Sequence, residues 1–515
     1  MYLTQGLHRA VQQHPDRVMT TFGERTRTFG EVADRVARLA GGLRGIGVRR
    51  GDRVAMLALN SDRYSEYVLA VPWADAVLNP LNVRWSAAEV GYALRDSATR
   101  VLLVDDAFAP MVPALRAAYP DLDRVIHTGE GPLPEGALAY EELLAAADPL
   151  EDARRSGDQL AGLFYTGGTT GFPKGVMLSH ANLITAWTGS MATGYLGGPD
   201  SLTLHVAPLF HLAGLAAWGT TLLIGGSHVI IPAFEPVAVL KAIAEHRVTD
   251  VLLVPTMIQL LVDHPEIDAH DLTSLRAMTY GASPIPQAVL ERAMKALPEV
   301  SFIQAFGMTE LAPVATFLGP ADHVEGHRLL SAGRAAPHVE IRVVDFEDAE
   351  VPTGTVGEIT VRGGNVMLGY WGQPEETRAA VRDGWMHTGD GGYLDGEGYL
   401  YIVGRLKDMI VTGGENVYAA EVENAVARHP AVAQCAVIGV PDAEWGERVH
   451  VVVVLHPGAE VELDELREHT RTLIAGYKTP RSMEVVHALP MSGAGKILKR
   501  ELRRRHWTDQ QRGVN

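Results

Sequence analysis

Cysteine, positive charge and long apolar runs are all scarce in this sequence of 515 residues. A single cysteine, Cys435, excludes an intrachain disulfide framework. Lysine and arginine total 45 against 62 aspartates and glutamates, a net charge of −17, whereas proteins that bind nucleic acids usually present a basic face. No stretch reaches the roughly 18 apolar residues of a membrane span, and the N-terminus lacks the apolar core of a signal peptide. We therefore expect a cytoplasmic protein without a nucleic-acid partner or an integral membrane segment.

The length exceeds what one hydrophobic core usually supports, so we expect two or more domains. Up to about residue 400, short apolar β-branched runs alternate with segments of helical periodicity. One such segment, residues 29–47, spaces Val32, Val36, Leu39 and Leu43 along a single helix face. This alternation predicts βαβ units and mainly parallel sheets with helices outside. The runs that predict buried strands are "RVAMLAL" (53–59), "TRVLLVDD" (99–106), "TDVLLVPT" (249–256) and "LRAMTYGAS" (275–283).

The pattern changes within residues 339–363, where "VEIRVVD" and "GEITVRG" predict antiparallel strands, and a smaller α/β unit follows. Cys435 lies there in the apolar run "VAQCAVIGV" and is predicted to be a buried strand residue rather than a nucleophile, because apolar surroundings raise a thiol pKa. The basic run "KILKRELRRR" predicts a solvated helix face. The expected fold class is α/β: an N-terminal domain (1–404) of parallel-rich α/β sheets plus a β-rich subdomain, a hinge (405–408), and a small mobile C-terminal α/β domain (409–515).

The stretch "YTGGTTGFPKG" (165–175) joins glycines, threonines and a lysine directly after an apolar run. Glycines let bare backbone N–H groups approach an anion, and hydroxyl and ammonium groups bind phosphate. The stretch therefore predicts a loop that holds a polyphosphate, although the pattern GxxxxGK[ST] is absent. An exposed flexible turn is the alternative for this loop taken alone.

Four further stretches carry polar side chains in unusual combinations: "AFGMTE" (305–310), "GWMHTGD" (384–390), "GRLKDMI" (404–410) and "LPMSGAGKILKR" (489–500). Each alone is typical of a turn, and the stretch 384–390 is expected to be a turn that ends at Asp390. Together and in this order, the five stretches resemble the adenylate-forming superfamily, which contains acyl-CoA synthetases, the adenylation domains of peptide synthetases and firefly luciferase. The resemblance covers essentially the whole chain and is nearest in appearance to fatty-acid or medium- and long-chain acyl-CoA ligases.

The resemblance implies a two-step reaction. A carboxylate attacks the α-phosphate of Mg-ATP to give an acyl-adenylate and pyrophosphate, and the thiol of coenzyme A then takes the acyl group. Because two anions must approach each other in the first step, positive groups are needed where negative charge accumulates. The implied cofactors are thus ATP, Mg²⁺ and coenzyme A.

The resemblance also assigns roles to residues. The residues that would bind the β- and γ-phosphates are Thr166, Gly167, Gly168, Thr169, Thr170 and Lys174. Mg²⁺ goes to the oxygen ligands Glu310 and Thr166. The ribose goes to Asp390 and Arg405. Phe306 would stack on the adenine. The residues beside it would be Gly281, Ala282, Ser283, Gly307, Met308 and Thr309.

The resemblance also assigns a catalytic role to one lysine and a hinge role to another. Lys496 would contact the α-phosphate and the attacking carboxylate, and Lys407 matches the residue about which the C-terminal domain turns between the two steps. The sequence departs from the family pattern at Gly167, where serine is commoner, at Phe306, where tyrosine is frequent, and at Met491, where a basic residue is common. None of these changes removes a group that adenylation needs.

The segment 205–226 resembles the family's acid pocket. His211 matches a histidine beside the acyl group, with a core histidine as the alternative. No early aspartate is present to bind an ammonium group, which argues against amino acids and favours an aliphatic or aromatic acid. The apolar wall is predicted to comprise Trp187, Leu212, Gly214, Met308 and Ala312.

For the acceptor, "TGGENVYAAEVE" (412–423) and "PDAEWGERV" (441–449) resemble acyl-CoA synthetases. Gly413 and Gly414 would let a pantetheine tunnel pass close to the backbone, and Trp445 and Tyr477 would line it; simple packing is the alternative for Trp445. An amide synthetase that passes the acyl group to an amine is the alternative function. A second is a catalytically inactive nucleotide- or acyl-binding protein, against which Lys496 argues. The expected partners are a small carboxylic acid, ATP and the acceptor, and a homodimer stays open.

Overall fold

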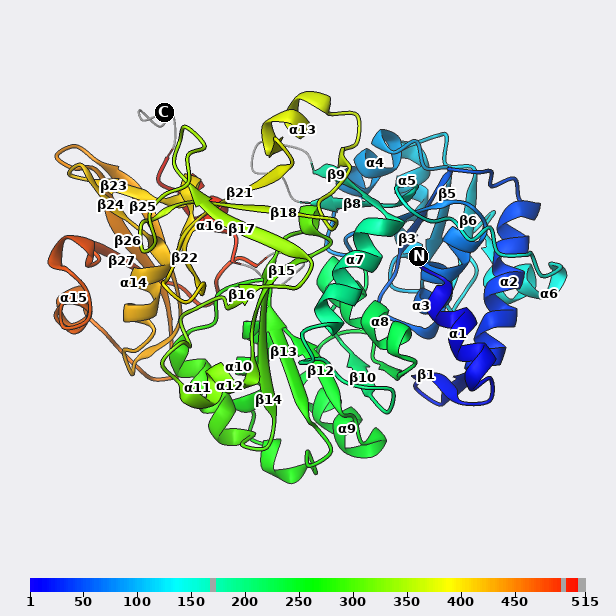
Figure 1. Ribbon diagram of the computed structural model, residues 1–515, viewed down its shortest axis with the longest axis horizontal. Helices are drawn as coiled ribbons and strands as arrows, with labels where there is room; N and C mark the ends of the chain where they lie inside the picture. Colours follow the sequence, from blue (N-terminus) through cyan, green and yellow to red (C-terminus); the bar gives the residue numbers. More distant parts are fainter. Residues whose placement is uncertain (167–172, 492–496, 508–515) are drawn as a thin grey trace.

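The computed structural model of the protein describes residues 1–166, 173–491 and 497–507 (Figure 1). The described strands form four sheets, of nine, eight, five and five strands. The first three sheets and their helices form a large unit, and the fourth sheet with its helices forms a small unit on its flank (Figure 1). Among the described residues, no helix combines the length and the apolar character that crossing a membrane requires.

One sheet of the large unit has eight strands in the order β19-β9-β8-β4-β3-β5-β6-β7. Its central pairs are parallel, as the alternating sequence pattern predicts. Strands β8 and β9 are antiparallel and pair Thr166 with Lys174. The strand bounds are β3 (Arg53–Leu57), β4 (Val77–Pro80), β5 (Val101–Val104), β6 (Arg124–His127), β7 (Leu138–Ala139), β8 (Leu160–Thr166), β9 (Lys174–Ser179) and β19 (Gly369–Tyr370).

The other large sheet has nine strands in the order β16-β15-β14-β13-β12-β10-β11-β1-β2. From β14 to β1 every neighbouring pair is parallel, so the carboxyl ends of these strands share one edge. The bounds are β1 (Val18–Phe22), β2 (Arg25–Thr28), β10 (Leu202–His205), β11 (Ser227–Ile230), β12 (Asp250–Leu253), β13 (Ala277–Gly281), β14 (Ser301–Gly307), β15 (Val314–Leu318) and β16 (Arg334–Ala335).

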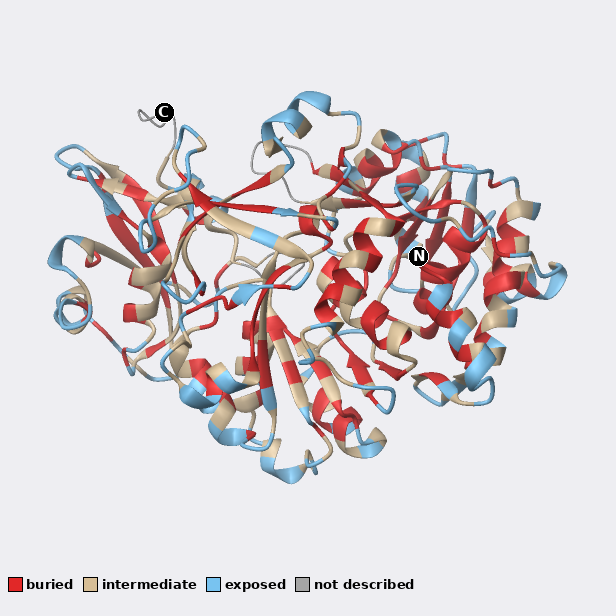
Figure 2. Ribbon diagram, viewed as in Figure 1, coloured by how far each residue is buried: buried red, intermediate tan, exposed pale blue. Residues whose placement is uncertain are grey.

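Helices cover the two large sheets, and α7 and α8 lie between them (Figure 1). The predicted helix is α2, which begins at a capping box made by Thr28 and Glu31 and buries all four residues of its expected apolar face. Figure 2 shows that the buried residues concentrate between and along the sheets. The bounds are α1 (Gln5–Gln13), α2 (Phe29–Gly45), α3 (Asp62–Trp73), α4 (Ala87–Asp96), α5 (Val112–Ala118), α6 (Tyr140–Ala146), α7 (His180–Met191), α8 (Leu212–Ile224), α9 (Pro236–His246), α10 (Pro255–Val262), α11 (Gln287–Ala296) and α12 (Pro320–Glu325).

The third sheet is antiparallel, as predicted for residues 339–363. The prediction of a turn ending at Asp390 is wrong, because Asp390 lies inside β21, whose backbone pairs with β18 on one side and β22 on the other. The bounds are β17 (Val339–Val344), β18 (Gly357–Gly363), α13 (Pro374–Ala380), β20 (Val381–Arg382), β21 (Trp385–Leu394) and β22 (Leu400–Arg405).

The small unit follows the short 3₁₀ helix η4 (Leu406–Asp408). Cys435 lies in β25, as predicted, and burial raises the pKa of its thiol. Its side chain is only half-buried, however, and its Sγ donates a hydrogen bond to the Glu423 carbonyl oxygen at 3.5 Å. The bounds are β23 (Ile410–Thr412), β24 (Glu415–Val417), α14 (Ala419–Val426), β25 (Val432–Asp442), β26 (Gly446–Leu455), α15 (Leu463–Arg471), β27 (Ser482–Val485) and α16 (Lys499–Arg504).

Candidate active site

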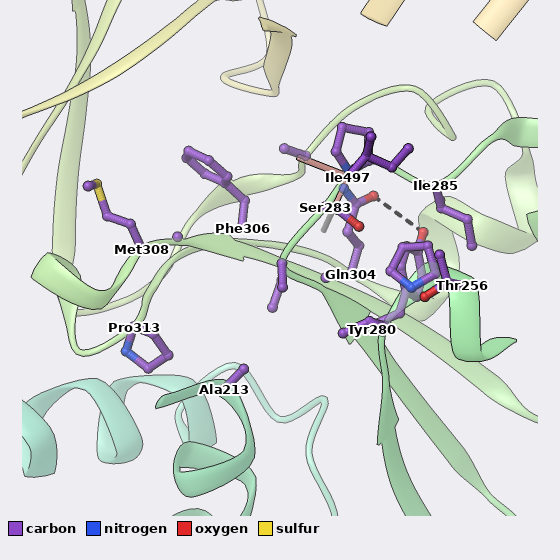
Figure 3. Close-up of a pocket in the computed structure, with 18 of the residues that line it drawn as sticks. Ala213, Thr256, Tyr280, Ser283, Ile285, Gln304, Phe306, Met308, Pro313 and Ile497 are labelled. Atoms are coloured by element: carbon purple, nitrogen blue, oxygen red, sulfur yellow. Dashed lines mark hydrogen bonds between the residues drawn. The ribbon is translucent and has the colours of Figure 1, made fainter. Parts of the chain in front are cut away.

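A cavity of about 1490 Å³ lies where the carboxyl ends of β13 and β14 face the small unit. Open α/β sheets bind ligands at this edge of the strands. Figure 3 shows Phe306 and Met308 at the end of β14, with Ala213 of α8 across from them and Ile497 of the small unit above. Both units therefore contribute to one cavity.

Two glycines bring backbones into contact at this edge. A Cβ on Gly281 would lie 2.1 Å from the Ala305 carbonyl oxygen, and a Cβ on Gly307 would lie 1.8 Å from that of Pro313. No side chain fits at such distances, so only glycine permits this approach. The residue after Gly281, Ala282, has a φ of 66°, which is uncommon for a residue with a Cβ. The expected adenine-binding residues thus occupy a tightly constrained turn that lines the cavity.

Glu310 is a buried carboxylate at the cavity wall, in the short 3₁₀ helix η3 (Thr309–Leu311). It accepts a hydrogen bond at 2.9 Å from the Tyr370 hydroxyl, and burial together with this carboxylate raises the pKa of Tyr370. The Lys174 ammonium lies 5.1 Å from the centre of the Tyr370 ring. Sequence reasoning missed Tyr370, which reaches the site because Tyr370 of β19 pairs with Val176 of β9.

The oxygen atoms at this wall fit a magnesium ion. Glu310 supplies a carboxylate and Thr166 a hydroxyl, and both line the same cavity. Mg²⁺ prefers such hard oxygen ligands and usually keeps several waters when it is bound with a nucleotide. A bound Mg²⁺ would neutralise phosphate charge beside Glu310.

Asp390 and Arg405 form a pair across β21 and β22. The Arg405 Nε lies 2.7 Å from the Asp390 Oδ1, and the Asp390 residue is only 7% exposed. Both residues line the cavity. Because Arg405 orients one carboxylate oxygen, the pair can present a fixed acceptor to hydroxyl groups. This arrangement suits the predicted contact with a ribose.

The small unit's link is anchored by an ion pair that the sequence did not reveal. Arg503 of α16 donates from Nη1 to Asp408 Oδ1 at 2.7 Å and from Nη2 to the Asp408 carbonyl oxygen at 3.1 Å. The prediction of a solvated basic face is therefore wrong for Arg503, which is largely buried by this contact. Lys407, the expected pivot, also lines the cavity.

Several predicted residues lie outside the described part of the chain. They are the phosphate-loop residues Gly167, Gly168, Thr169 and Thr170 and the catalytic candidate Lys496. Their described neighbours Thr166 and Ile497 both line the cavity.

The expected acid pocket is an extension of the cavity along α8. His211 caps the start of α8, where its Nδ1 accepts a hydrogen bond from the Ala213 amide at 3.3 Å, and it lines the cavity with Leu212 and Met308. Trp187 does not belong to this wall, because it is 1% exposed and packs against Gly219 inside the helical layer.

The cavity reaches several polar side chains at its far end, near the start of β10 and β12, which sequence reasoning missed. Asp250 begins β12 and pairs with Ala277, at the start of the strand that ends at Gly281. Four residues of strand separate these ends, or about 13 Å. The polar side chains of this far end are those of Ser201, Thr203, Thr220, Thr221 and Asp250, beside the apolar Ala217, Ile224 and Val251.

The residues predicted to line a pantetheine tunnel lie apart from this cavity. Gly413 has a φ of 60° and is covered by the Trp445 ring, which also stacks on the Arg481 guanidinium at 4.2 Å. Trp445 and Tyr477 are 37% and 39% exposed. Neither they nor Gly413 and Gly414 are among the described residues that line the cavity.

Comparison with known proteins agrees with these features. The AMP-binding enzyme family matches residues 7–371, and the AMP-binding enzyme C-terminal domain matches residues 421–496. Feruloyl-CoA synthase of Amycolatopsis sp is 43% identical over 96% of this chain and 97% of its own. The fatty acid–[acyl-carrier-protein] ligase ScoC of Streptomyces coeruleorubidus is 38% identical over 95% and 94%. The amide bond synthetase McbA of Marinactinospora thermotolerans superposes with a TM-score of 0.88 at 31% identity over 97% and 99%.

The names of these relatives describe synthases, ligases and synthetases that form bonds to an acyl group, and the matches cover nearly the whole chain. The α/β fold with its small C-terminal unit is that of the same enzymes. The chain therefore belongs to the AMP-binding enzyme family within the adenylate-forming superfamily, as an AMP-forming acid–thiol ligase.

Proposed function

We propose that the protein activates an aromatic acid that carries a polar group at its far end, and transfers the acyl group to coenzyme A. The observation that carries the proposal is the gradient along the cavity. Apolar side chains of Ala213, Met308 and Phe317 line the cavity towards the carboxyl end of β14. Hydroxyl and carboxylate groups line it where β10 and β12 pair Thr203 with Asp250. A ligand pocket of this kind binds an apolar body and orients it through a few polar contacts.

Asp250 supplies to this polar part of the cavity wall a carboxylate that can accept a hydrogen bond from a ligand hydroxyl. Asp250 Oδ2 accepts from the Thr249 hydroxyl at 2.5 Å, and Thr203 and Thr221 hydroxyls lie 2.9 Å apart. A site built to bind a substrate hydroxyl discriminates strongly against analogues that lack it, because its buried polar groups then lose their partner. The name of the 43% identical relative, a feruloyl-CoA synthase, supports a hydroxylated aromatic acid.

The test is a panel of acids with pyrophosphate release as the readout. Ring-hydroxylated cinnamates should exceed unsubstituted cinnamate in kcat/KM, and Asp250→Ala should reduce that preference. Asp268→Ala, at an exposed position of the same unit, is the matched control. Higher kcat/KM for long-chain fatty acids, or an unchanged preference in Asp250→Ala, would overturn the substrate class.

For the first step, the proposal places the phosphates on Thr166–Lys174, Mg²⁺ on Glu310 and Thr166, the ribose on Asp390, and the reacting carboxylate beside Lys496 and His211. The support is that one cavity is lined by Thr166, Glu310 and Asp390. Tyr370 lies beside this wall, where it contacts both Lys174 and Glu310. Glu310→Gln should raise the Mg²⁺ concentration needed for half-maximal pyrophosphate release. An unchanged Mg²⁺ dependence would remove Glu310 from the metal site.

Residues 405–408 are proposed to be a hinge between residues 1–404 and 409–515. The support is that Gly413, Trp445 and Tyr477 lie apart from the cavity, so a thiol guided by them reaches the adenylate only after the small unit moves. Lys407→Pro removes a backbone donor and restricts φ to about −65°. It should spare pyrophosphate release and slow thioester formation; equal loss of both steps, or of neither, would contradict the hinge.

An amine acceptor is the second candidate, because the solved neighbour McbA is an amide bond synthetase. Offering coenzyme A and a set of amines to the same adenylate, with products identified by mass spectrometry, decides between them. Amide in place of thioester would replace the proposed acceptor while leaving acid activation intact.

A further inference from the structure

Three side chains of metal-ligating type converge in the small unit, apart from the cavity. They are His450 of β26, Glu484 of β27 and His506, which follows α16. One ligand atom from each lies within 4.8 Å of those of the other two. Strands β26 and β27 are parallel neighbours that pair His450 with Ser482, so His450 and Glu484 lie on the same face two residues apart in register.

His450 is 5% exposed, and only one of its nitrogens has a hydrogen-bond partner among the described residues. Its Nδ1 lies 2.8 Å from the Ser482 hydroxyl, whereas its Nε2 is buried without a partner. The Nε2 of His506 is also buried without a hydrogen-bond partner, and the two rings are 4.8 Å apart between centres. Buried polar atoms are seldom left unpaired, so two such nitrogens beside one another point to a ligand.

Glu484 completes the cluster with one available oxygen. Its Oε1 accepts from Arg505 Nη1 at 3.2 Å, and its Oε2 lies 3.9 Å from His506 Nε2. The positive groups that face the cluster are Arg505 and Arg448. Burial, with smaller contributions from His506 and Arg448, lowers the pKa of His450 to about 4. Its imidazole is therefore neutral near pH 7, the form that donates a lone pair to a metal.

Two imidazoles and a carboxylate are a ligand set that suits zinc, whereas Mg²⁺ prefers oxygen alone. Tetrahedral zinc with bonds near 2.0–2.2 Å needs ligand atoms about 3.3 Å apart, so distances in the present cluster must shorten by up to about 1.5 Å. The Glu484 and His506 side chains are 34% and 30% exposed and have room to make that movement. Two imidazole nitrogens and a carboxylate oxygen all donate lone pairs, so this set favours a cation although Arg505 and Arg448 lie near it.

We propose that His450, Glu484 and His506 bind one Zn²⁺ ion, with water as the remaining ligand. Because His506 lies two residues after the end of α16, the ion would join the end of this helix to β26 and β27. A hydrogen bond from Trp507 Nε1 to the Gly439 carbonyl oxygen at 3.0 Å already holds the same segment on β25. Helix α16 also carries Arg503, the partner of Asp408 in the link between the units. The ion thus stabilises the element that anchors the link, and it has no part in the adenylation chemistry.

The test uses the full chain without a histidine tag, stripped of metal by a chelator. Zn²⁺ binding is titrated against a chromophoric chelator in excess Mg²⁺, which occupies oxygen-only sites. One equivalent of Zn²⁺ should bind tightly to the wild type. His506→Gln and Glu484→Gln should each lower the affinity for this Zn²⁺ ion by at least about 10- to 100-fold. Removing even an outer-shell partner of a metal causes a loss of that size.

His487→Gln is the matched control, since His487 is an exposed histidine three residues after Glu484. It should bind Zn²⁺ as the wild type does. Co²⁺ bound in place of Zn²⁺ should give visible absorption bands that His506→Gln abolishes. No tight equivalent in the wild type, or equal binding by wild type and His506→Gln, would overturn the proposal. Should His450→Gln fail to fold, the more exposed His506 and Glu484 still decide the outcome.

Discussion

The large unit builds its side of the cavity from strand ends whose backbones touch, whereas the small unit reaches the cavity through a few polar contacts. Gly281 and Gly307 approach carbonyl oxygens so closely that no Cβ fits. Across the cavity, hydrogen bonds from Gln259 to the Ala433 carbonyl oxygen and from Arg428 to Gln287 join the units. Close packing fixes geometry, and exposed hydrogen bonds break and re-form at low cost. The large unit's side of the cavity is thus rigid, and the proposed hinge movement belongs to the small unit.

The largest expected effect is at Lys496. We predict that Lys496→Ala slows pyrophosphate release by about 10²–10³-fold, because the proposed role of Lys496 is to stabilise transition-state charge. Lys295→Ala, on the exposed face of α11, should leave the rate unchanged. The rate is measured at saturating acid and ATP, and near-wild-type release by Lys496→Ala would remove the small unit from the first step.

The next effect is at Asp390. Replacing it with alanine removes the acceptors that we propose for the ribose hydroxyls and the ion pair with Arg405. A charge-assisted hydrogen bond contributes about 1.5–3 kcal/mol, so the KM for ATP should rise roughly 10- to 100-fold. Titration calorimetry with ATP checks the same quantity without turnover. Unchanged KM and affinity would restrict Asp390 to holding β21 and β22 together.

Gly307→Ala tests the rigid side directly. The added Cβ would overlap the Pro313 carbonyl oxygen, and such overpacking typically costs about 1–3 kcal/mol of the free energy of unfolding. Chemical denaturation measures this loss, and adenine binding should weaken with it. Gly396→Ala is the control, because nothing lies within 4 Å of its Cβ. Equal stability of the two variants would show that the strand ends are not closely packed.

The smallest effect is expected at the contact between the units. Arg428→Ala removes a hydrogen bond of 2.6 Å to Gln287, worth about 0.5–1.5 kcal/mol. We expect the rate of pyrophosphate release to fall by up to about tenfold while thioester formation from preformed adenylate is unchanged or faster. Arg467→Ala, in α15 of the same unit, is the control. A parallel loss in both steps would mean that Arg428 stabilises the small unit itself.

Local patterns predicted much of this molecule because their causes are local. The periodicity of residues 29–47 places Val32, Val36, Leu39 and Leu43 on one face of α2 whatever that face packs against. Five polar stretches in one order were enough to predict the superfamily, and the family matches confirm that prediction. The error at Asp390 has the same origin. Its glycine-rich surroundings are typical of a turn, but pairing with two distant strands made them part of β21.

Amino-acid order alone determined the strand-and-helix alternation, the apolar faces and the motif residues, since each depends on neighbours within a few turns of chain. Only the tertiary structure decided that Tyr370 donates to Glu310, that Arg503 holds Asp408 and that Asp250 lies at the far end of the cavity. Each of these contacts joins residues whose distance along the chain carries no periodic signal. The backbone pairing of β19 with β9 and the packing of α16 on the small unit's sheet bring such residues together.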